Sequence, residues 1–177
     1  LRIVVGKSFL FHQLQSIEIN PKDLAAKKKE FCKGIKSLAE NRISELAYEN
    51  GRTKDINVSF EDADIQLPSE YFISVITEIV ENAMLYSPKR SGIRIVGGID
   101  GDQYIVTVRD EGLGMTPEQI SKIGAYQKFQ EDLEGKSGVG LGLINTKKVM
   151  DLFNGSLLIK SNLGIETTVR LSLPIVK

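Results

Sequence analysis

The glycines of the segment SGVGLGL are the residues with the clearest chemical potential. Gly138, Gly140 and Gly142 alternate directly before a helical pattern of apolar residues. A backbone without Cβ atoms exposes its N–H groups, and a helix N-terminus adds the positive end of the helix dipole. Both features favour phosphate binding. The spacing fits neither the Walker nor the Rossmann pattern, so the segment predicts a phosphate site, and a glycine turn that only permits close packing is the alternative.

A second cluster, DEGLGM, begins where a predicted strand ends. Asp110 precedes Gly112 and Gly114 at alternate positions. A carboxylate at a strand end can accept a hydrogen bond from the exocyclic amine of a ligand, while the bare backbone lies flat against a ring. The alternative is a tight Asp-Gly turn without a ligand.

A third cluster lies on a predicted helix. Glu78 and Asn82 are four residues apart and therefore share one helix face. The amide oxygen of an Asn suits a magnesium ion that keeps most of its waters and is completed by substrate phosphates. The alternative is a solvated polar face.

The elements that must position these clusters alternate irregularly between helix and strand. Residues 1–14 mix both signals. Helical patterns follow at residues 24–50, between Pro68 and Pro88, and at residues 116–124 and 140–153. Alternating runs predict strands at residues 55–60, 93–99 and 104–109 and in the segments GSLLIKS and ETTVRLSLPI, and the segment YQKFQEDLEGKSG predicts a mobile loop. Because the βαβ rhythm is absent and hairpins occur, we expect an α+β fold of two layers.

Composition excludes several classes of function. The 177 residues carry 23 basic and 23 acidic side chains, which gives no electrostatic case for nucleic acid or an anionic membrane as partner. One cysteine and one histidine exclude an internal disulfide and a Cys- or His-based zinc site. The single cysteine fits a reducing interior, and no apolar run has the length of a membrane span. We expect a cytoplasmic location, in a parent protein that is either soluble or attached to a membrane. The first residue is Leu1, which suggests a piece of a longer protein.

Taken together and in this order, the segments resemble the ATP-binding catalytic domain of sensor histidine kinases. That domain belongs to the superfamily shared by gyrase-type ATPases, the Hsp90 chaperone and MutL-type repair proteins. The resemblance implies a Bergerat-type two-layer α/β sandwich, with a mixed, mainly antiparallel sheet packed on three helices. It divides the chain into residues 1–16, the tail of an upstream dimerisation helix or a linker, and residues 17–177, the catalytic domain.

The same resemblance implies the site residues. EIVENAMLYSP looks like the N box, with Asn82 as magnesium ligand and Glu78 as its polar support, and DEGLGM looks like the first glycine box, with Asp110 reading the adenine amino group. Phe129 matches the F box, and GVGLGL matches the second glycine box. The implied catalytic residues are Asn82 and Glu78, and the implied ATP-binding residues are Asn82, Tyr86, Asp110, Gly112, Gly114, Phe129, Lys136, Gly138, Gly140, Gly142, Leu143 and Thr167.

Two positions depart from the family pattern. The N box often has a Lys three residues after its Asn, where this chain has Leu85. A phosphate partner is therefore missing, and we expect a substitute from Lys89, Lys128 or Lys136. The last box, usually Gly-x-Gly-Thr, has Glu166 in place of its second glycine, whereas its threonine is present as Thr167.

The phosphoacceptor is expected outside this chain. His12 is followed by Gln13, whereas family acceptors are usually followed by Glu or Asp and lie farther upstream of the N box. The resemblance therefore implies transfer of the γ-phosphoryl group of ATP, with Mg²⁺, to a histidine on a dimerisation domain of the same parent protein.

The implied partners are that dimerisation domain and a response-regulator receiver domain. IGAYQKFQ and the segment after GVGLGL look most like kinases fused to a receiver. The parent is expected to be a homodimer and the present chain a monomer, with no nucleic acid partner. Two alternatives stay open: a serine kinase of the anti-sigma-factor type, and a catalytically inactive nucleotide-binding interaction module.

Overall fold

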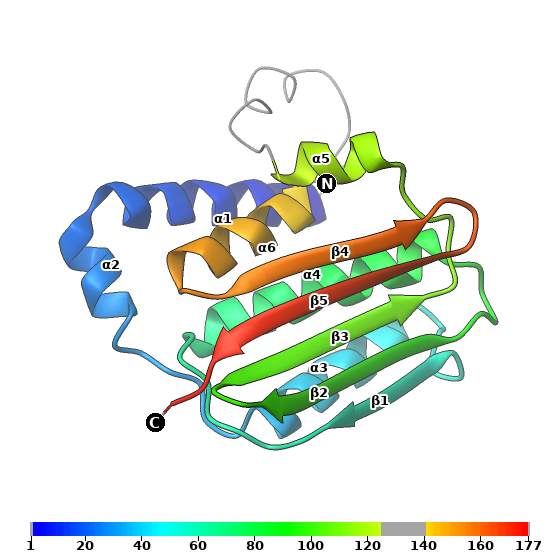
Figure 1. Cartoon of the computed structure of the whole chain (residues 1–177), viewed down its shortest axis with the longest axis horizontal. Coiled ribbons are helices and arrows are strands. Elements are labelled where there is room, and N and C mark those ends of the chain that lie inside the picture. Colours follow the sequence, from blue (N-terminus) through cyan, green and yellow to red (C-terminus); the bar gives the residue numbers. More distant parts are fainter. Residues whose placement is uncertain (1, 125–140, 177) are drawn as a thin grey trace.

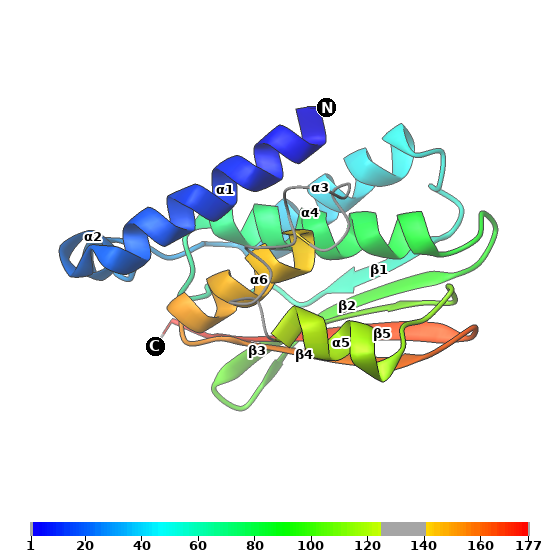
Figure 2. The same cartoon turned by 90° about the horizontal axis from the view of Figure 1, so that it is seen from above.

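The computed structural model describes residues 2–124 and 141–176, which form one sheet with helices on one of its faces (Figures 1 and 2). The strands are β1 (Ile56–Phe60), β2 (Ile93–Asp100), β3 (Gln103–Asp110), β4 (Ser156–Asn162) and β5 (Glu166–Pro174). The helices are α1 (Arg2–Ile19), α2 (Pro21–Lys27), α3 (Ile35–Glu49), α4 (Ser69–Tyr86), α5 (Pro117–Gly124) and α6 (Leu141–Leu152). The segment expected to be a mobile loop, residues 126–138, lies outside the described residues.

The sheet is mixed and mainly antiparallel, as expected. Its strand order is β1-β2-β3-β5-β4, and β1 and β2 form the parallel pair. The other neighbours pair antiparallel, including the predicted hairpin of β2 and β3. Alternate residues of β3 (Tyr104, Val106 and Val108) are buried, because side chains alternate between the two faces of a strand. One face of the sheet therefore belongs to the core.

Three helices pack on that face and confirm the two-layer architecture. α3 contacts β1, α4 contacts β3, and α6 contacts β4. α4 lies centrally and packs against both α3 and α6. Its apolar residues follow the helical period, so that Phe72, Ile76 and Ile79 are buried. α4 lies between Pro68 and Pro88, as the sequence predicts, and carries Glu78 and Asn82.

The first residues form a helix and not a mixed segment. α1 runs without a break from Arg2 to Ile19, so the expected division between residues 16 and 17 falls inside it. α1 lies against α6, where Leu14 is buried and Glu18 forms an ion pair of 2.6 Å with Lys148. Among the residues that the structure describes, no helix combines the length and apolar character that a bilayer crossing needs.

The predicted helix over residues 24–50 is wrong in its middle. α2 ends at Lys27 and α3 begins at Ile35. Between them, the backbone N–H and C=O of Cys32 pair with Ile65, and Gly34 has a φ of +59°, which no helix interior allows. Phe31, placed on the apolar face by periodicity, is 39% exposed. Tertiary pairing with a distant segment therefore overrides the local helical period.

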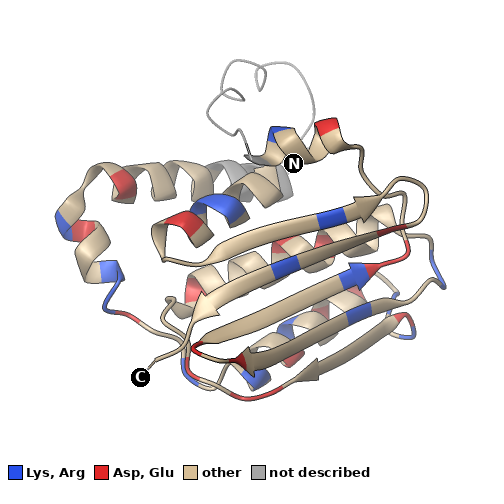
Figure 3. Ribbon diagram, viewed as in Figure 1, with Lys and Arg blue, Asp and Glu red and all other residues tan. Residues whose placement is uncertain are grey.

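The opposite face of the sheet carries charged residues. Figure 3, in which this face is turned toward the viewer, shows basic residues along the strands. Arg94, Arg109, Lys160 and Arg170 are exposed there. A concave site must therefore be sought on the helical side, where the sheet and helices meet.

Candidate nucleotide site

A cavity of about 450 Å³ lies where α4, α5 and α6 meet β3 and β5. It brings together six of the residues predicted from the sequence, which come from four separate segments: Asn82, Tyr86, Asp110, Gly114, Leu143 and Thr167. α4 supplies the first two, and β3 with the loop after it supplies the next two. The remaining two lie on α6 and β5. Segments that are far apart in sequence thus converge on one space large enough for a small ligand.

Asp110 is the most strongly perturbed group of this cavity. Its side chain is 5% exposed, and its Oδ1 accepts no hydrogen bond from the residues that the structure describes. Burial raises the pKa of Asp110 to about 6, and the negative charge of Glu166 adds to the rise, while the backbone N–H of Gly112 opposes it. A buried acceptor without a partner is costly, which indicates that a ligand donor belongs at this position.

The loop after β3 is fixed by hydrogen bonds from both sides. The backbone N–H of Leu113 donates to the carbonyl of Tyr86 at the end of α4 (3.0 Å), and the N–H of Gly164, in the turn between β4 and β5, donates to the carbonyl of Leu113 (2.7 Å). The N–H of Met115 donates to Ser161 Oγ at 2.8 Å. α4 and the β4–β5 turn therefore hold in place the loop after β3, which lines the cavity.

The glycines of this loop are required by packing within the chain. A Cβ on Gly112 would lie 2.5 Å from both Asp110 Oδ1 and the Tyr86 carbonyl oxygen. Gly114 has a φ of +63°, and its Cβ would lie 2.2 Å from the carbonyl oxygen of Asn162. Close approach to protein backbone thus explains both residues without a ligand. The sequence had suggested approach to a ring, which stays a prediction.

The polar residues of α4 differ in their access to the cavity. Asn82 is half-buried and lines it, whereas Glu78, one turn earlier, is buried and is not a lining residue. Leu85, where the family often has a lysine, is 72% exposed. Lys89, proposed as a substitute, lies with its Nζ 3.9 Å from the position of a Cβ on Gly51 and does not line the cavity.

Several lining residues were not singled out from the sequence. The walls are largely apolar, from Ile79, Val108, Leu113, Met115, Ile144, Leu163 and Val169, and α5 adds Gln119, Lys122 and Ile123. In the sequence, Ile79, Val108, Ile144 and Val169 read as ordinary apolar positions of helices and strands, whereas Leu113, Met115 and Leu163 stand in segments expected to be turns or loops. The only signal for the α5 group was a short amphipathic helix next to the DEGLGM segment.

The glycine-rich segment is described only in part. Phe129, Lys136, Gly138 and Gly140, together with Lys128, lie outside the described residues. Gly142 lies in the first turn of α6, and its carbonyl accepts a hydrogen bond from Thr146 Oγ1 at 3.0 Å. Its neighbour Leu143 reaches the cavity, so the segment does lead into a helix next to the site.

The unexpected Glu166 is accommodated on the other face of the sheet. Glu166 precedes Thr167 on β5, so the two side chains point to opposite faces. Glu166 forms an ion pair of 2.6 Å with Arg109, which likewise precedes Asp110. Thr167 lines the cavity, and its hydroxyl is hydrogen bonded to Ser161 at 2.9 Å. The side chain of Glu166 therefore lies outside the cavity, where its charge still raises the pKa of Asp110.

The donor set fits a magnesium ion only in combination with a ligand. Within residues 2–124 and 141–176, no three His, Cys, Asp or Glu side chains are grouped so that they could hold a metal. Asn82 offers one amide oxygen at the cavity. Magnesium is commonly held by one or two protein oxygens together with waters and substrate phosphates, so this single donor is compatible with it.

Sequence comparison identifies relatives among bacterial histidine kinase and sensor proteins. The chain is 32% identical over 103 residues to the histidine protein kinase DivJ of Caulobacter vibrioides, a match that covers 57% of this chain and 17% of DivJ. It is 31% identical over 102 residues to the sensor protein SrrB of Staphylococcus aureus, which covers 56% of this chain and 18% of SrrB. The chain thus corresponds to less than a fifth of these longer proteins.

The fold is shared with solved catalytic domains. The mycobacterial sensor histidine kinase MprB superimposes with a TM-score of 0.67 at 18% identity, over 82% of this chain and 97% of that one. The catalytic domain of the histidine kinase ThkA gives 0.67 at 20% identity, over 84% and 99%. A sequence profile covers residues 69–177, more than half of the chain. The chain therefore belongs to the family of histidine kinase-, DNA gyrase B- and HSP90-like ATPases.

Proposed function

We propose that this chain binds Mg-ATP and transfers its γ-phosphoryl group to a histidine on a dimerisation domain outside the chain. The observation that carries the proposal is the buried Asp110 Oδ1, which accepts no hydrogen bond from the described residues, in a cavity with largely apolar walls. Such a carboxylate can read the exocyclic amine of adenine, while the walls take the ring. The kinase relatives favour histidine over serine as the acceptor.

Each cavity residue has a role in this proposal. Asp110 accepts a hydrogen bond from the adenine amino group, and Tyr86 packs beside the base. Gly142 and Leu143, at the start of α6, lie where the helix dipole favours the phosphates. The catalytic contribution of such a site is mainly positioning and charge stabilisation, with the acceptor imidazole attacking in line.

Asn82 is the proposed magnesium ligand. When bound, magnesium neutralises charge on the phosphates. Asn82 supplies its amide oxygen at the cavity, and Glu78, buried one turn earlier, provides polar support for this part of α4. The missing lysine at Leu85 is replaced in our proposal by Lys122, the cation that lines the cavity within the described part of the chain.

The likeness to a histidine protein kinase supports the proposed acceptor and partners. His12 is exposed on α1 and is followed by Gln13, so we place the acceptor outside the chain. The proposed partners are a histidine-bearing dimerisation domain of the same parent protein and a response-regulator receiver. The parent is proposed to be a homodimer that presents this domain in the cytoplasm.

Calorimetric titration with a non-hydrolysable ATP analogue tests the proposal. The wild type should bind the analogue, and more tightly with magnesium than without. Asp110→Asn should weaken or abolish binding, because a neutral amide oxygen is a weaker acceptor for the adenine amine than a carboxylate, and the amide NH2 competes for the same position. Asn82→Ala should keep binding but lose its magnesium dependence. A folded wild type that binds nothing would overturn the assignment and leave an interaction module that does not use nucleotide.

A second assay addresses the acceptor. Incubation with radiolabelled ATP should give little label on this chain alone, and acid-labile label on an added dimerisation domain. His12→Gln should leave both results unchanged. Acid-labile label on the chain that disappears in His12→Gln would move the acceptor to α1, and acid-stable label on a partner would favour the serine kinase alternative.

A further inference from the structure

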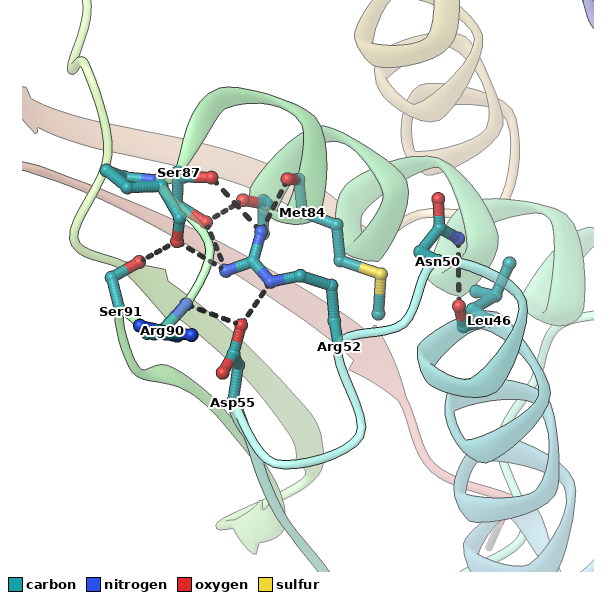
Figure 4. A network of polar contacts seen from close by, with 10 residues as sticks. Leu46, Asn50, Arg52, Asp55, Met84, Ser87, Arg90 and Ser91 are labelled. Atoms are coloured by element: carbon teal, nitrogen blue, oxygen red, sulfur yellow. Dashed lines mark hydrogen bonds and ion pairs between the residues drawn. The ribbon is translucent and has the colours of Figure 1, made fainter.

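Arg52 lies outside the cavity but is among the most completely bonded side chains of the described structure. It follows α3 in the turn before β1 and is 2% exposed (Figure 4). All five of its N–H groups donate hydrogen bonds. The acceptors are the Asp55 carboxylate, the Met84 carbonyl (2.7 Å), the Ser87 carbonyl (3.1 Å), Ser87 Oγ (3.1 Å) and the Pro88 carbonyl (2.9 Å).

Four of these acceptors lie at the C-terminal end of α4. A helix leaves its last four carbonyls without helical partners, and many helices solve this with a glycine in the left-handed region. α4 has no such residue: it ends at Tyr86, and its cap residue Ser87, directly before Pro88, is extended, with φ −107° and ψ 144°. The guanidinium of Arg52 takes the place of the missing cap.

The end of α4 is bonded almost completely by this arrangement. Ser87 Oγ donates to the Ala83 carbonyl at 2.6 Å, Arg52 donates to the Met84 carbonyl, and the Leu113 N–H donates to the Tyr86 carbonyl at 3.0 Å. Three of the last four carbonyls thus have partners from beyond the helix. One of these partners, Leu113, belongs to the loop that carries Gly114 into the cavity.

The buried charge of Arg52 is compensated locally. Asp55 accepts from the Arg52 Nε, and the backbone N–H of Arg90 donates to the same carboxylate at 3.0 Å. The hydrogen bond from Arg90 and the charge of Arg52 hold the pKa of Asp55 below its ordinary value. The negative end of the α4 dipole stabilises the cation further. Arg52 is therefore fixed in place with its fork directed at the helix end.

We propose that Arg52 is a positioning residue of the nucleotide site. It holds the last turn of α4, so that Asn82 and Tyr86 face the cavity and the Tyr86 carbonyl stays aligned with the Leu113 N–H. In this way one side chain in the α3–β1 turn sets the position of Asn82, the proposed magnesium ligand, relative to the loop after β3, which lies next to the adenine. The inference rests on the proposed function, and nothing in the sequence singled out this arginine.

The test compares Arg52→Met with Arg42→Met. Arg42 is the matched control: it also joins α3 to α4, through a 2.9 Å hydrogen bond from its Nε to Thr77 Oγ1, but in the middle of α4. At a temperature where each variant is fully folded, we expect Arg52→Met to weaken binding of the ATP analogue by about tenfold and Arg42→Met to change it less than about twofold. Loss of global stability alone does not alter affinity under these conditions.

Amide hydrogen exchange supplies a readout that needs no nucleotide. In Arg52→Met the Leu113 amide should exchange faster relative to the Val106 amide in the centre of β3, whereas Arg42→Met should leave this ratio unchanged. If Arg52→Met does not fold, two other variants take its place. Arg52→Lys keeps the charge and loses the planar guanidinium, and Ser87→Ala removes one acceptor of Arg52 together with the donor to the Ala83 carbonyl. Both should show the same selective effect at smaller size.

The outcomes separate this inference from the proposed function. A wild type that binds no nucleotide overturns the proposed nucleotide binding. In that case the ratio of the Leu113 and Val106 amide exchange rates still shows whether Arg52 holds the loop after β3 in place. A wild type that binds, with unchanged affinity and exchange ratio in the Arg52 variants, overturns the positioning role. A purely structural role would lower the unfolding midpoint and speed exchange at Leu113 and Val106 alike.

Discussion

Asp110 on β3 and Thr167 on β5 are register partners on adjacent strands, and both side chains face the cavity. Their predecessors, Arg109 and Glu166, form an ion pair on the opposite face. The sheet thus separates a buried carboxylate that can read a ligand from an exposed pair of charges, with one peptide unit between them. The separation follows from the alternation of side chains along a strand. A substitution of Arg109 or Glu166 is therefore expected to affect Asp110 through its charge and not through direct contact.

Asp110→Asn should make the protein more stable at neutral pH. The folded-state pKa, about 6, lies above the unfolded value of 3.8, so the ionised side chain destabilises the fold above this range. The penalty grows between pH 3.8 and 6 and is complete above pH 6. We expect a gain on the order of 2 kcal/mol in the free energy of unfolding at pH 7.5, measured by urea denaturation.

The same comparison at pH 4 is the control for this prediction. Asp110 is then largely protonated in the folded state, so the advantage of the Asn variant should shrink to near zero. Equal gains at pH 4 and pH 7.5 would show that burial of the charge is not the cause.

Nucleotide affinity should fall as the pH drops through the pKa of Asp110. The carboxylate is the acceptor for the adenine amine, and below pH 6 a proton competes for it. Adenosine is the suitable ligand because it has no phosphate that titrates in this range. Its dissociation constant should rise about tenfold from pH 7.5 to pH 5, by calorimetry or fluorescence.

Glu166→Gln provides the matched variant for the pH profile. The charge of Glu166 raises the pKa of Asp110, and its removal also leaves Arg109 without its partner. Both changes lower the pKa, so the midpoint of the profile should move to lower pH. A midpoint that stays in place or rises would argue against Asp110 as the titrating group.

Gly114→Ala should be far more destabilising than Gly164→Ala. Both glycines have positive φ values, +63° and +77°, so each substitution costs about 1–2 kcal/mol of backbone strain. A Cβ on Gly114 would also lie 2.2 Å from the backbone oxygen of Asn162, whereas on Gly164 it would meet nothing within 4 Å. Urea denaturation should show a larger decrease in the free energy of unfolding for Gly114→Ala than for Gly164→Ala. Equal decreases would mean that the loop moves to relieve the clash without a loss of stability.

Lys122→Ala should weaken binding of the ATP analogue but not of adenosine. Lys122 lines the cavity and forms an exposed ion pair of 3.2 Å with Glu118, and of the two ligands only the ATP analogue carries phosphates with which its charge can interact. Because the side chain is largely exposed, we expect a loss of about threefold to fivefold, which shrinks as salt is added. Lys160→Ala, on the opposite face of the sheet, should have no effect on either ligand. An equal loss for adenosine would place Lys122 at the base.

Local patterns in the sequence predicted most of the elements. The apolar period of α4 between Pro68 and Pro88 and the hairpin of β2 and β3 were both correct, because Pro and turn residues end elements wherever they lie. The prediction failed over residues 24–50, where the bridge between Cys32 and Ile65 interrupts the helical period. A pairing partner more than thirty residues away leaves no trace in a local pattern.

The sequence by itself determined which residue types stand beside each other: a carboxylate before two glycines, an asparagine one turn after a glutamate, and glycines before a helix. Only the tertiary structure decided that Asp110 is buried with a raised pKa, that Glu166 points away from the cavity, and that Arg52 closes the end of α4. Burial and capping depend on what lies next to a residue in space. Backbone hydrogen bonds and packing between distant segments set those neighbours, and spacing along the chain does not record them.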